Sequence, residues 1–399
     1  MNAIRDAGRT TLLLVVLAAV LVATPVWATK TSFKYGGYVK FDAMATHYNN
    51  GVPSELSPVR DFHIPALVPV GDTDKNYTMD FHVKESRFNF QTLTAFENGR
   101  TLRGFLELDF LLSVGGDERV SNSFNPRLRH FYFTTGPWLF GQTWMTFMVV
   151  ILPDNLDFIG TPDGVVFGRQ PQIRYTRGPW QFSLENPEMT VSFFDATDTT
   201  YARVVTGSSG IPDIVARRNL EGAWGRASVA AVVRQLRYVD DTHAINDREI
   251  GYGLTVGSEI KVGEKDDLRL QATGGSGLGR YLGLNLVNAA IIDPANGQLK
   301  PIDQVAGFIA YRHFWNERWR STIDAAAFYG KNPDTAKGSA LNRDAQSFSA
   351  NLLYSPVPKW TVGVEWFHAR RRLENGTDGW YQRLQFSARW DFGYLSPVN

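Results

Sequence analysis

Residues 250–262 read Ile-Gly-Tyr-Gly-Leu-Thr-Val-Gly-Ser-Glu-Ile-Lys-Val, in which large apolar side chains alternate with small or polar ones. The same period of two recurs in residues 102–110 and 383–392. Successive side chains of a β-strand point to opposite faces, so each segment predicts a strand with one oily and one wet face. A soluble β-sandwich shows the same alternation. The strands alone therefore leave two all-β folds open.

The connections between these segments distinguish the two folds. Short turns are predicted at seven places: 97–100, 136–137, 178–179, 221–222, 263–267, 316–317 and 355–359. Long loop-like stretches lie at eight places: 44–80, 112–126, 144–168, 187–212, 238–248, 275–303, 331–344 and 372–379. Strict alternation of short and long connections is typical of up-and-down barrels in an outer membrane, whereas sandwiches mix connection lengths. We therefore predict an all-β fold, a transmembrane antiparallel β-barrel of about 16 strands.

The first 28 residues have the three parts of a secretory signal peptide. Arg5 and Arg9 give a positive start, residues 12–22 form an apolar run, and residues 26–28 read Val-Trp-Ala. The apolar run is too short for a membrane-spanning helix. We predict a signal peptide at residues 1–28 and a barrel domain at residues 29–399, exported to the outer membrane of a Gram-negative bacterium.

Composition narrows the class of protein. Removal of residues 1–28 takes away Arg5, Asp6 and Arg9, so Lys+Arg falls from 41 to 39 and Asp+Glu from 40 to 39. A neutral chain argues against a nucleic-acid-binding face. Several tryptophans lie near the predicted short turns, where the aromatic girdle of a membrane barrel is found. These are Trp138, Trp180, Trp224, Trp315, Trp319 and Trp360.

The third long stretch differs from the others in being apolar. Residues 147–152 read Phe-Met-Val-Val-Ile-Leu, and Asp154, Asp157 and Asp163 follow them. Apolar side chains gain free energy by leaving water. We predict that this loop folds into the barrel, packs on the wall and presents its acids to the pore. The alternative is an apolar loop that packs on other loops outside the barrel.

Five segments carry a resemblance to a known family. They are Gly-Gly-Tyr-Val-Lys-Phe-Asp-Ala at 36–43, Arg-Leu-Arg-His at 127–130, Gly-Gln-Thr-Trp at 141–144, Leu-Asp-Phe at 156–158 and Arg-Gln-Pro-Gln-Ile-Arg-Tyr-Thr at 169–176. The chain resembles the DcaP-like outer-membrane porins over essentially the whole mature sequence. That resemblance implies a homotrimer with an inward-folded third loop and a preference for anions such as dicarboxylates.

Two features depart from that family's pattern. Only residues 29–32 separate the predicted cleavage site from the first predicted strand, where family members often carry a coiled-coil extension. The chain also continues past Phe392 to Asn399, whereas barrel proteins usually end on an aromatic residue.

The candidate solute-binding groups are charged residues on the face of each strand that is expected to point into the barrel. Strand direction and a rise of ~3.3 Å per residue place Lys40, Arg87 and Arg383 on one wall at mid-height. The predicted constriction consists of these three residues with Arg129, Asp154 and Asp157. Three further arginines are expected nearer the periplasmic mouth: Arg103, Arg174 and Arg389. Clustered guanidinium groups favour anions, and an Arg fork suits a carboxylate.

Neutralisation of this basic wall is the alternative to anion preference. Glu85, Glu107 and Asp109 lie next to the candidate cations in the sequence pattern. If these acids pair with the wall, it would be rigid and only weakly selective.

Enzymatic and adhesive barrels are the competing functions. The seven histidines lack metal-ligand spacing, and no Gly-x-Ser-x-Gly motif is present. For a lipase or protease the best arrangement is His130 with Ser121 or Ser123, while the proline-containing first loop would suit an adhesin or receptor. We predict instead a passive channel for small anionic solutes, without cofactor or metal. Its expected surroundings are outer-membrane lipid and lipopolysaccharide.

Overall fold

The computed structural model describes residues 28–71, 74–112, 121, 123–195, 200–206 and 209–395. The predicted signal peptide lies outside these residues except for Ala28, and so do residues 396–399. Among the described residues, the model contains no helix that has both the length and the apolar character to span a membrane.

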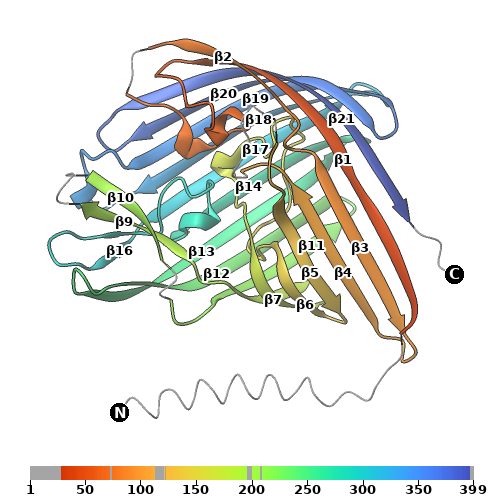
Figure 1. Ribbon diagram of the computed structural model, residues 1–399, viewed down its shortest axis with the longest axis horizontal. Coiled ribbons are helices and arrows are strands. Elements are labelled where there is room, and N and C mark those ends of the chain that lie inside the picture. The colour runs from red at the N-terminus through yellow and green to blue at the C-terminus, as the bar shows by residue number, and fades with distance from the viewer. Residues whose placement is uncertain are drawn as a thin grey trace.

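The strands form one closed antiparallel barrel (Figure 1). β1 (Ala28–Tyr48) pairs with the last strand, β21 (Asp378–Leu395), and this pairing closes the sheet. On its other side β1 pairs with β3 (Arg87–Phe96) along its first half and with β2 (Asn76–His82) along its second half. β2 and β3 are thus two halves of one strand of the wall, interrupted at residues 83–86. Counted in this way the wall has 16 strands, and the predicted fold class is confirmed.

The other strands of the wall follow in chain order. They are β4 (Thr101–Asp109), β5 (Arg127–Thr135), β6 (Trp138–Trp144), β7 (Arg169–Arg177), β8 (Trp180–Glu185), β11 (Asp213–Gly222), β12 (Gly225–Asp240), β13 (Ile245–Val262), β14 (Asp266–Ser276), β17 (Asp303–Phe314), β18 (Trp319–Lys331), β19 (Asn342–Val357) and β20 (Trp360–Leu373). The residues predicted to precede the first strand, 29–32, belong to β1 itself, and at the other end β21 continues beyond Phe392.

The alternation of short and long connections is present, with two corrections. The fifth and eighth connections, predicted at 238–248 and 372–379, are turns at 241–244 and 374–377. The strands that flank them continue to pair up to Asp240–Ile245 and Arg372–Asp378. A strand that rises above the membrane can carry charged residues on both faces, so these segments lack the alternation of the membrane-spanning parts. The long connections are numbered in chain order, and four of them contribute to the sites: L1 (49–75), L3 (145–168), L6 (277–302) and L7 (332–341).

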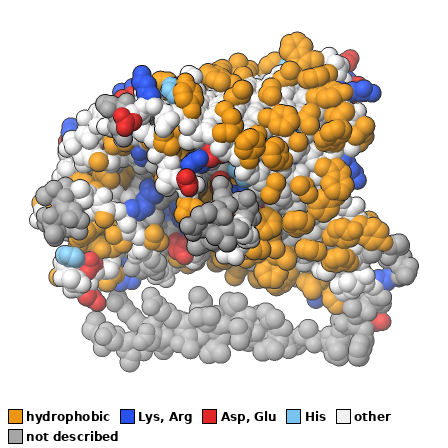
Figure 2. All heavy atoms as spheres, turned by 45° about the horizontal axis from the view of Figure 1, so that its top comes forward, with side chains coloured by type: hydrophobic (Ala, Val, Ile, Leu, Met, Phe, Trp, Pro, Cys, Tyr) orange, Lys and Arg blue, Asp and Glu red, His pale blue; other side chains and the backbone are white. Residues whose placement is uncertain are grey.

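The outer wall carries the oily face of the strands, as Figure 2 shows. In β13, Ile250, Tyr252 and Leu254 are exposed on the outer face, whereas Gly251 and Gly253 are buried. The six tryptophans predicted to form a girdle are all exposed near the short turns. This distribution is that of a barrel surrounded by lipid.

A second, smaller sheet lies at the end of the barrel that carries the long connections (Figure 1). It consists of β9 (Met189–Asp195), β10 (Thr200–Thr206), β15 (Ala290–Ile292) and β16 (Leu299–Pro301). β9 pairs in parallel with β15, which joins the connection after β8 to L6. Long connections of outer-membrane barrels face the exterior, so this sheet lies at the external mouth.

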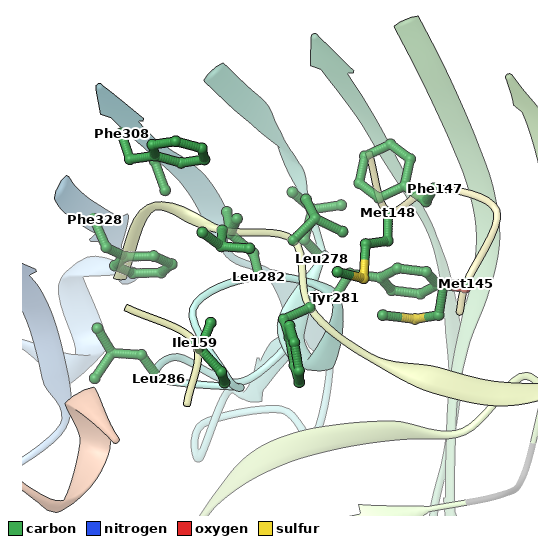
Figure 3. Packing of buried hydrophobic residues seen from close by; sticks show 14 of the residues in the cluster. Met145, Phe147, Met148, Ile159, Leu278, Tyr281, Leu282, Leu286, Phe308 and Phe328 are labelled. Carbon is green, nitrogen blue, oxygen red and sulfur yellow. The ribbon is translucent and has the colours of Figure 1, made fainter. Parts of the chain in front are cut away.

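The largest apolar cluster lies inside the barrel rather than around it. Phe147 and Met148 of L3 pack with Leu278 and Tyr281 of L6 against the inner wall (Figure 3). The wall there carries small side chains, among them Ala230, Val232, Ala306 and Ala326. Small wall residues leave room for the two loops, so the predicted inward fold of the third loop is confirmed.

Candidate functional site

L3 crosses the lumen and is fastened to the wall that lies far from its own strands. At Gly164 it meets β17 so closely that a Cβ atom would lie 2.2 Å from the carbonyl oxygen of Gly307. The backbone N–H groups of Leu156 and Asp157 donate to the Glu365 carboxylate of β20, at 2.8 and 2.9 Å. These contacts fix the height at which L3 narrows the pore.

L1 closes on L3 from above. Two 3-10 turns begin at prolines, Pro58–Arg60 and Pro65–Leu67, and between them His63 is fully buried. The His63 ring lies 3.0 Å from the carboxylate of Asp163 and 2.9 Å from the hydroxyl of Tyr381. The proline-containing first loop is therefore held against L3 and β21 by buried contacts.

Lys40 lies where it was predicted, on the lumenal face of β1, but it is buried and neutralised. Its Nζ bonds the Glu85 carboxylate and the carbonyl oxygen of Leu156 (2.5 Å), and Asp42 lies at 3.3 Å. The side chain is 5% exposed. Lys40 thus supports L3 and offers little charge to a solute.

Arg383 does not lie at the height of Lys40. The register pairs Lys40 with Arg389 and Thr46 with Arg383, so Arg383 is six residues nearer the external end. The prediction that Lys40 and Arg383 lie at one height is wrong, because β21 extends further at its periplasmic end than the sequence indicated, whereas Arg389 does lie nearer that end than Arg383. Arg383 is buried, donates to Thr46 (3.0 Å) and to the carbonyl oxygen of Val59 (2.5 Å), and lies 3.6 Å from Asp157.

Three arginines surround the ring of Phe158, which projects from L3, and a fourth lies beside them. The guanidinium groups of Arg129, Arg127 and Arg87 lie 5.3, 5.6 and 6.0 Å from the ring centre. Arg169 lies over the ring of Trp144 at 4.7 Å and over that of Phe167, which is itself 5.9 Å from Phe158. We call Arg87, Arg127, Arg129 and Arg169 the arginine cluster.

Two carboxylates balance part of this charge. Glu107 accepts from Arg129 at 2.8 Å, and Asp109 accepts from Arg129 at 2.9 Å and from Arg127 at 2.7 Å. Arg87 lies 3.6 Å from Glu107 but its Nε has no hydrogen-bond partner, and neither has Nη1 of Arg169, among the described residues. Both of these nitrogens are buried. The cluster therefore contains two N–H donors that the described residues leave without a hydrogen bond.

A β-bulge in β5 accounts for the close spacing of side chains in the arginine cluster. Glu107 of β4 pairs with His130 and the next pair is Leu108–Leu128, so Arg129 is an extra residue in β5. Arg129 and His130 consequently both point inward, opposite one residue of β4. His130 bonds Thr143 at 2.9 Å, while Ser121 and Ser123 bond each other. The described residues contain no group that could hold a metal ion.

The remaining predicted residues lie apart from the arginine cluster. Asp154 of L3 pairs with Arg320 (2.7 Å) and Arg312 (3.3 Å) on the other side of the barrel. Arg103 is exposed and bonds Gln91, and Arg389 pairs with Asp391 at 2.6 Å. Arg174 lies on β7, paired with Leu139 and Ser183.

Sequence reasoning missed Arg127 and Arg169 as site residues. Both begin segments that carry the family resemblance, 127–130 and 169–176. Because each stands at the first residue of its strand, the period of two could not decide which way its side chain points.

The comparison with protein families decides the identity of this barrel. A model of the DcaP outer membrane protein family matches residues 18–392. The chain belongs to this family. The match confirms the resemblance found in the sequence and identifies the molecule as an outer-membrane porin of a Gram-negative bacterium.

Solved structures agree on the fold of this DcaP-family chain. The outer membrane channel DcaP of Acinetobacter baumannii is similar with a TM-score of 0.75 and 23% identity, covering 93% of this chain and 100% of that chain. The anion-selective porin from Comamonas acidovorans has a TM-score of 0.52 and 11% identity, covering 91% of this chain and 100% of that chain. No curated protein matches the sequence. At these identities the structures show the architecture alone.

Proposed function

We propose that this porin favours small organic anions, carboxylates such as dicarboxylates in particular, over cations. One observation carries the proposal: the four arginines of the arginine cluster have only two carboxylates bonded to them among the described residues. Four positive against two negative groups leave a surplus of two positive charges. In a narrow, low-dielectric passage such a surplus raises the local concentration of anions.

The arginine cluster also has the geometry for a brief contact with a carboxylate. The unbonded Nε of Arg87 and Nη1 of Arg169 are fixed, since their guanidinium groups lie against the rings of Tyr38 and Trp144. Charge-assisted hydrogen bonds to such donors are stronger than neutral ones. Glu107 and Asp109 keep the attraction moderate, and moderate binding is what conduction requires.

The test is the reversal potential of the channel in a planar bilayer under a KCl gradient. Arg87→Ala combined with Arg169→Ala should shift the reversal potential toward cation preference and slow dicarboxylate uptake into liposomes. Arg100→Ala with Arg177→Ala is the matched control, because it removes two exposed arginines at short turns. The shift should be largest at low salt, since the Debye length falls to ~3 Å at 1 M.

An unchanged ion preference in the double variant would contradict the proposal and leave a general porin. The same recordings address assembly. We propose a homotrimer, in keeping with the family resemblance, and a trimer should close in three equal conductance steps. A single step for every inserted particle would contradict the trimer.

A further inference from the structure

A second group of arginines lies at the external mouth, apart from the arginine cluster. L1, β10, L6, L7 and the end of β20 enclose a pocket of about 300 Å³. Arg203 of β10 and Arg371 of β20 line it together with Asn288, Asn332 and Asn342. None of these residues belongs to the constriction, and the small external sheet contributes to the pocket through Ser192 of β9 and Tyr201 of β10.

Neutral groups hold both guanidinium groups in place. Arg203 donates from Nε to Asn288 at 2.8 Å and from Nη2 to the carbonyl oxygen of Asn285 at 2.8 Å. Arg371 donates from Nη1 to Asn342 at 3.1 Å and to the carbonyl oxygen of Ala66. The two arginines are also linked, because the carbonyl oxygen of Leu286 accepts from both Asn342 and Arg203. They are therefore neighbours in one rigid frame.

These two arginines differ from Arg129 and Arg312 in their charge balance. Arg129 and Arg312 each pair with aspartate, whereas neither Arg203 nor Arg371 forms an ion pair with any described residue. Nε of Arg371 is buried and has no hydrogen-bond partner in the described part of the chain. A buried donor without a partner costs free energy, and an incoming acceptor relieves that cost.

The rest of the lining indicates what kind of anion fits. Val287 is buried in the wall of the pocket, while Leu67 and Leu341 lie at its edge and are partly accessible. Tyr201 bonds the carbonyl oxygen of Thr335 at 3.1 Å and so joins β10 to L7 along one side. Apolar side chains next to two cations suit a carboxylate with an apolar body better than a fully hydrated inorganic ion.

We propose that this mouth pocket is a binding site for small organic carboxylates, separate from the constriction. Arg203 and Arg371 would share the carboxylate oxygens, and the apolar edge would cover the body of the solute. The site faces the external solution, so it would capture solute before the solute reaches L3. Its existence does not depend on the selectivity of the arginine cluster.

The test measures binding directly on the full chain in detergent micelles, with benzoate as the probe in isothermal titration. Arg203→Gln combined with Arg371→Gln should weaken benzoate binding by about tenfold or more, since each Arg supplies charge-assisted hydrogen bonds. Arg370→Gln with Arg372→Gln is the matched control: both arginines lie beside Arg371 on β20 and pair with Asp378 and Asp344. The control should bind benzoate as the unaltered chain does.

Three results would decide the proposal. Benzoate binding that persists in the Arg87→Ala and Arg169→Ala background places the site at the mouth and keeps it distinct from the constriction. Equal affinity in the mouth variant and the unaltered chain would overturn the proposal, and so would inorganic phosphate binding as tightly as benzoate. If the double variant does not fold, Arg371→Lys keeps the charge but loses the fork, and it should still bind more weakly.

Discussion

The lumen of this barrel has an apolar side and a charged side, which position L3 by different means. On the apolar side, buried side chains such as Phe147 and Met148 pack among small wall residues. Each large apolar side chain removed from water contributes about 1.5–3 kcal/mol. On the charged side, Lys40 donates to the Leu156 carbonyl oxygen of L3 while it pairs with Glu85, and Arg383 forms a buried ion pair with Asp157 of L3. Desolvation of such buried charges offsets much of their attraction.

The difference indicates which side of the lumen determines the position of L3 and which side determines ion selectivity. Apolar packing stabilises the inward position of L3. The charged side adds specific contacts and leaves a few donors unpaired, among them Nε of Arg87. We infer that variants on the apolar side mainly alter pore size, whereas variants on the charged side alter stability or ion preference according to their burial.

Removal of L3's apolar segment should have the largest effect. Deletion of residues 147–157 takes away the packing on L6 and the contacts with Lys40 and Glu365. A barrel of 16 strands without this loop has a wide aqueous channel, so single-channel conductance should rise by about twofold or more. Deletion of 294–297, at the exposed tip between β15 and β16, is the control and should leave conductance unchanged. Equal conductance of the 147–157 deletion and the intact chain would mean that L3 does not limit the pore.

Substitution of Arg383 should have a smaller effect, and this effect should be on stability rather than on ion preference. The side chain is buried, and its removal leaves Asp157 without its cation and the Val59 carbonyl without its donor. Breaking one partner of a buried pair costs about 3–5 kcal/mol. Arg383→Ala should therefore lower the free energy of unfolding in urea by about that amount. Arg372→Ala, which breaks a half-exposed pair with Asp344, should cost about 0–1 kcal/mol. Equal losses in the two variants would contradict the structural role of Arg383.

Sequence reasoning predicted the barrel and its loops well, because both depend on local signals. The period of two fixes the outer face of β13, and the apolar run at 147–152 predicts that L3 lies inside. Pairing across strands is not local. The register that sets Lys40 against Arg389 depends on where β21 ends, and the inward direction of Arg129 depends on a bulge in β5.

The charge balance was harder still to predict. Glu85, Glu107 and Asp109 were recognised as possible partners, but only the three-dimensional arrangement shows that Glu85 pairs with Lys40 while Arg169 has no acidic partner among the described residues. Residues predicted on the same, lumenal face of their strands also differ in burial. Arg383 is buried and structural, whereas Arg103 is exposed. The alternation in a sequence shows on which face of a strand a side chain lies, but it does not show how deeply that side chain is buried.

Substitution of Arg103 should have the smallest effect on ion preference. It tests whether arginines on the charged side of the lumen differ in their influence on passing ions. Arg103 lies three residues past the turn at 97–100, is exposed, and donates to Gln91 at 3.1 Å without an ion pair among the described residues. A charge at a wide, hydrated mouth is screened beyond about 10 Å at 0.1 M salt. Arg103→Ala should therefore leave the reversal potential unchanged at that salt concentration, while Arg87→Ala shifts it. The two variants remove the same charge from neighbouring strands, β4 and β3, so only depth and surroundings differ. Equal shifts would mean that total lumenal charge, and not the cluster around Phe158, determines ion preference.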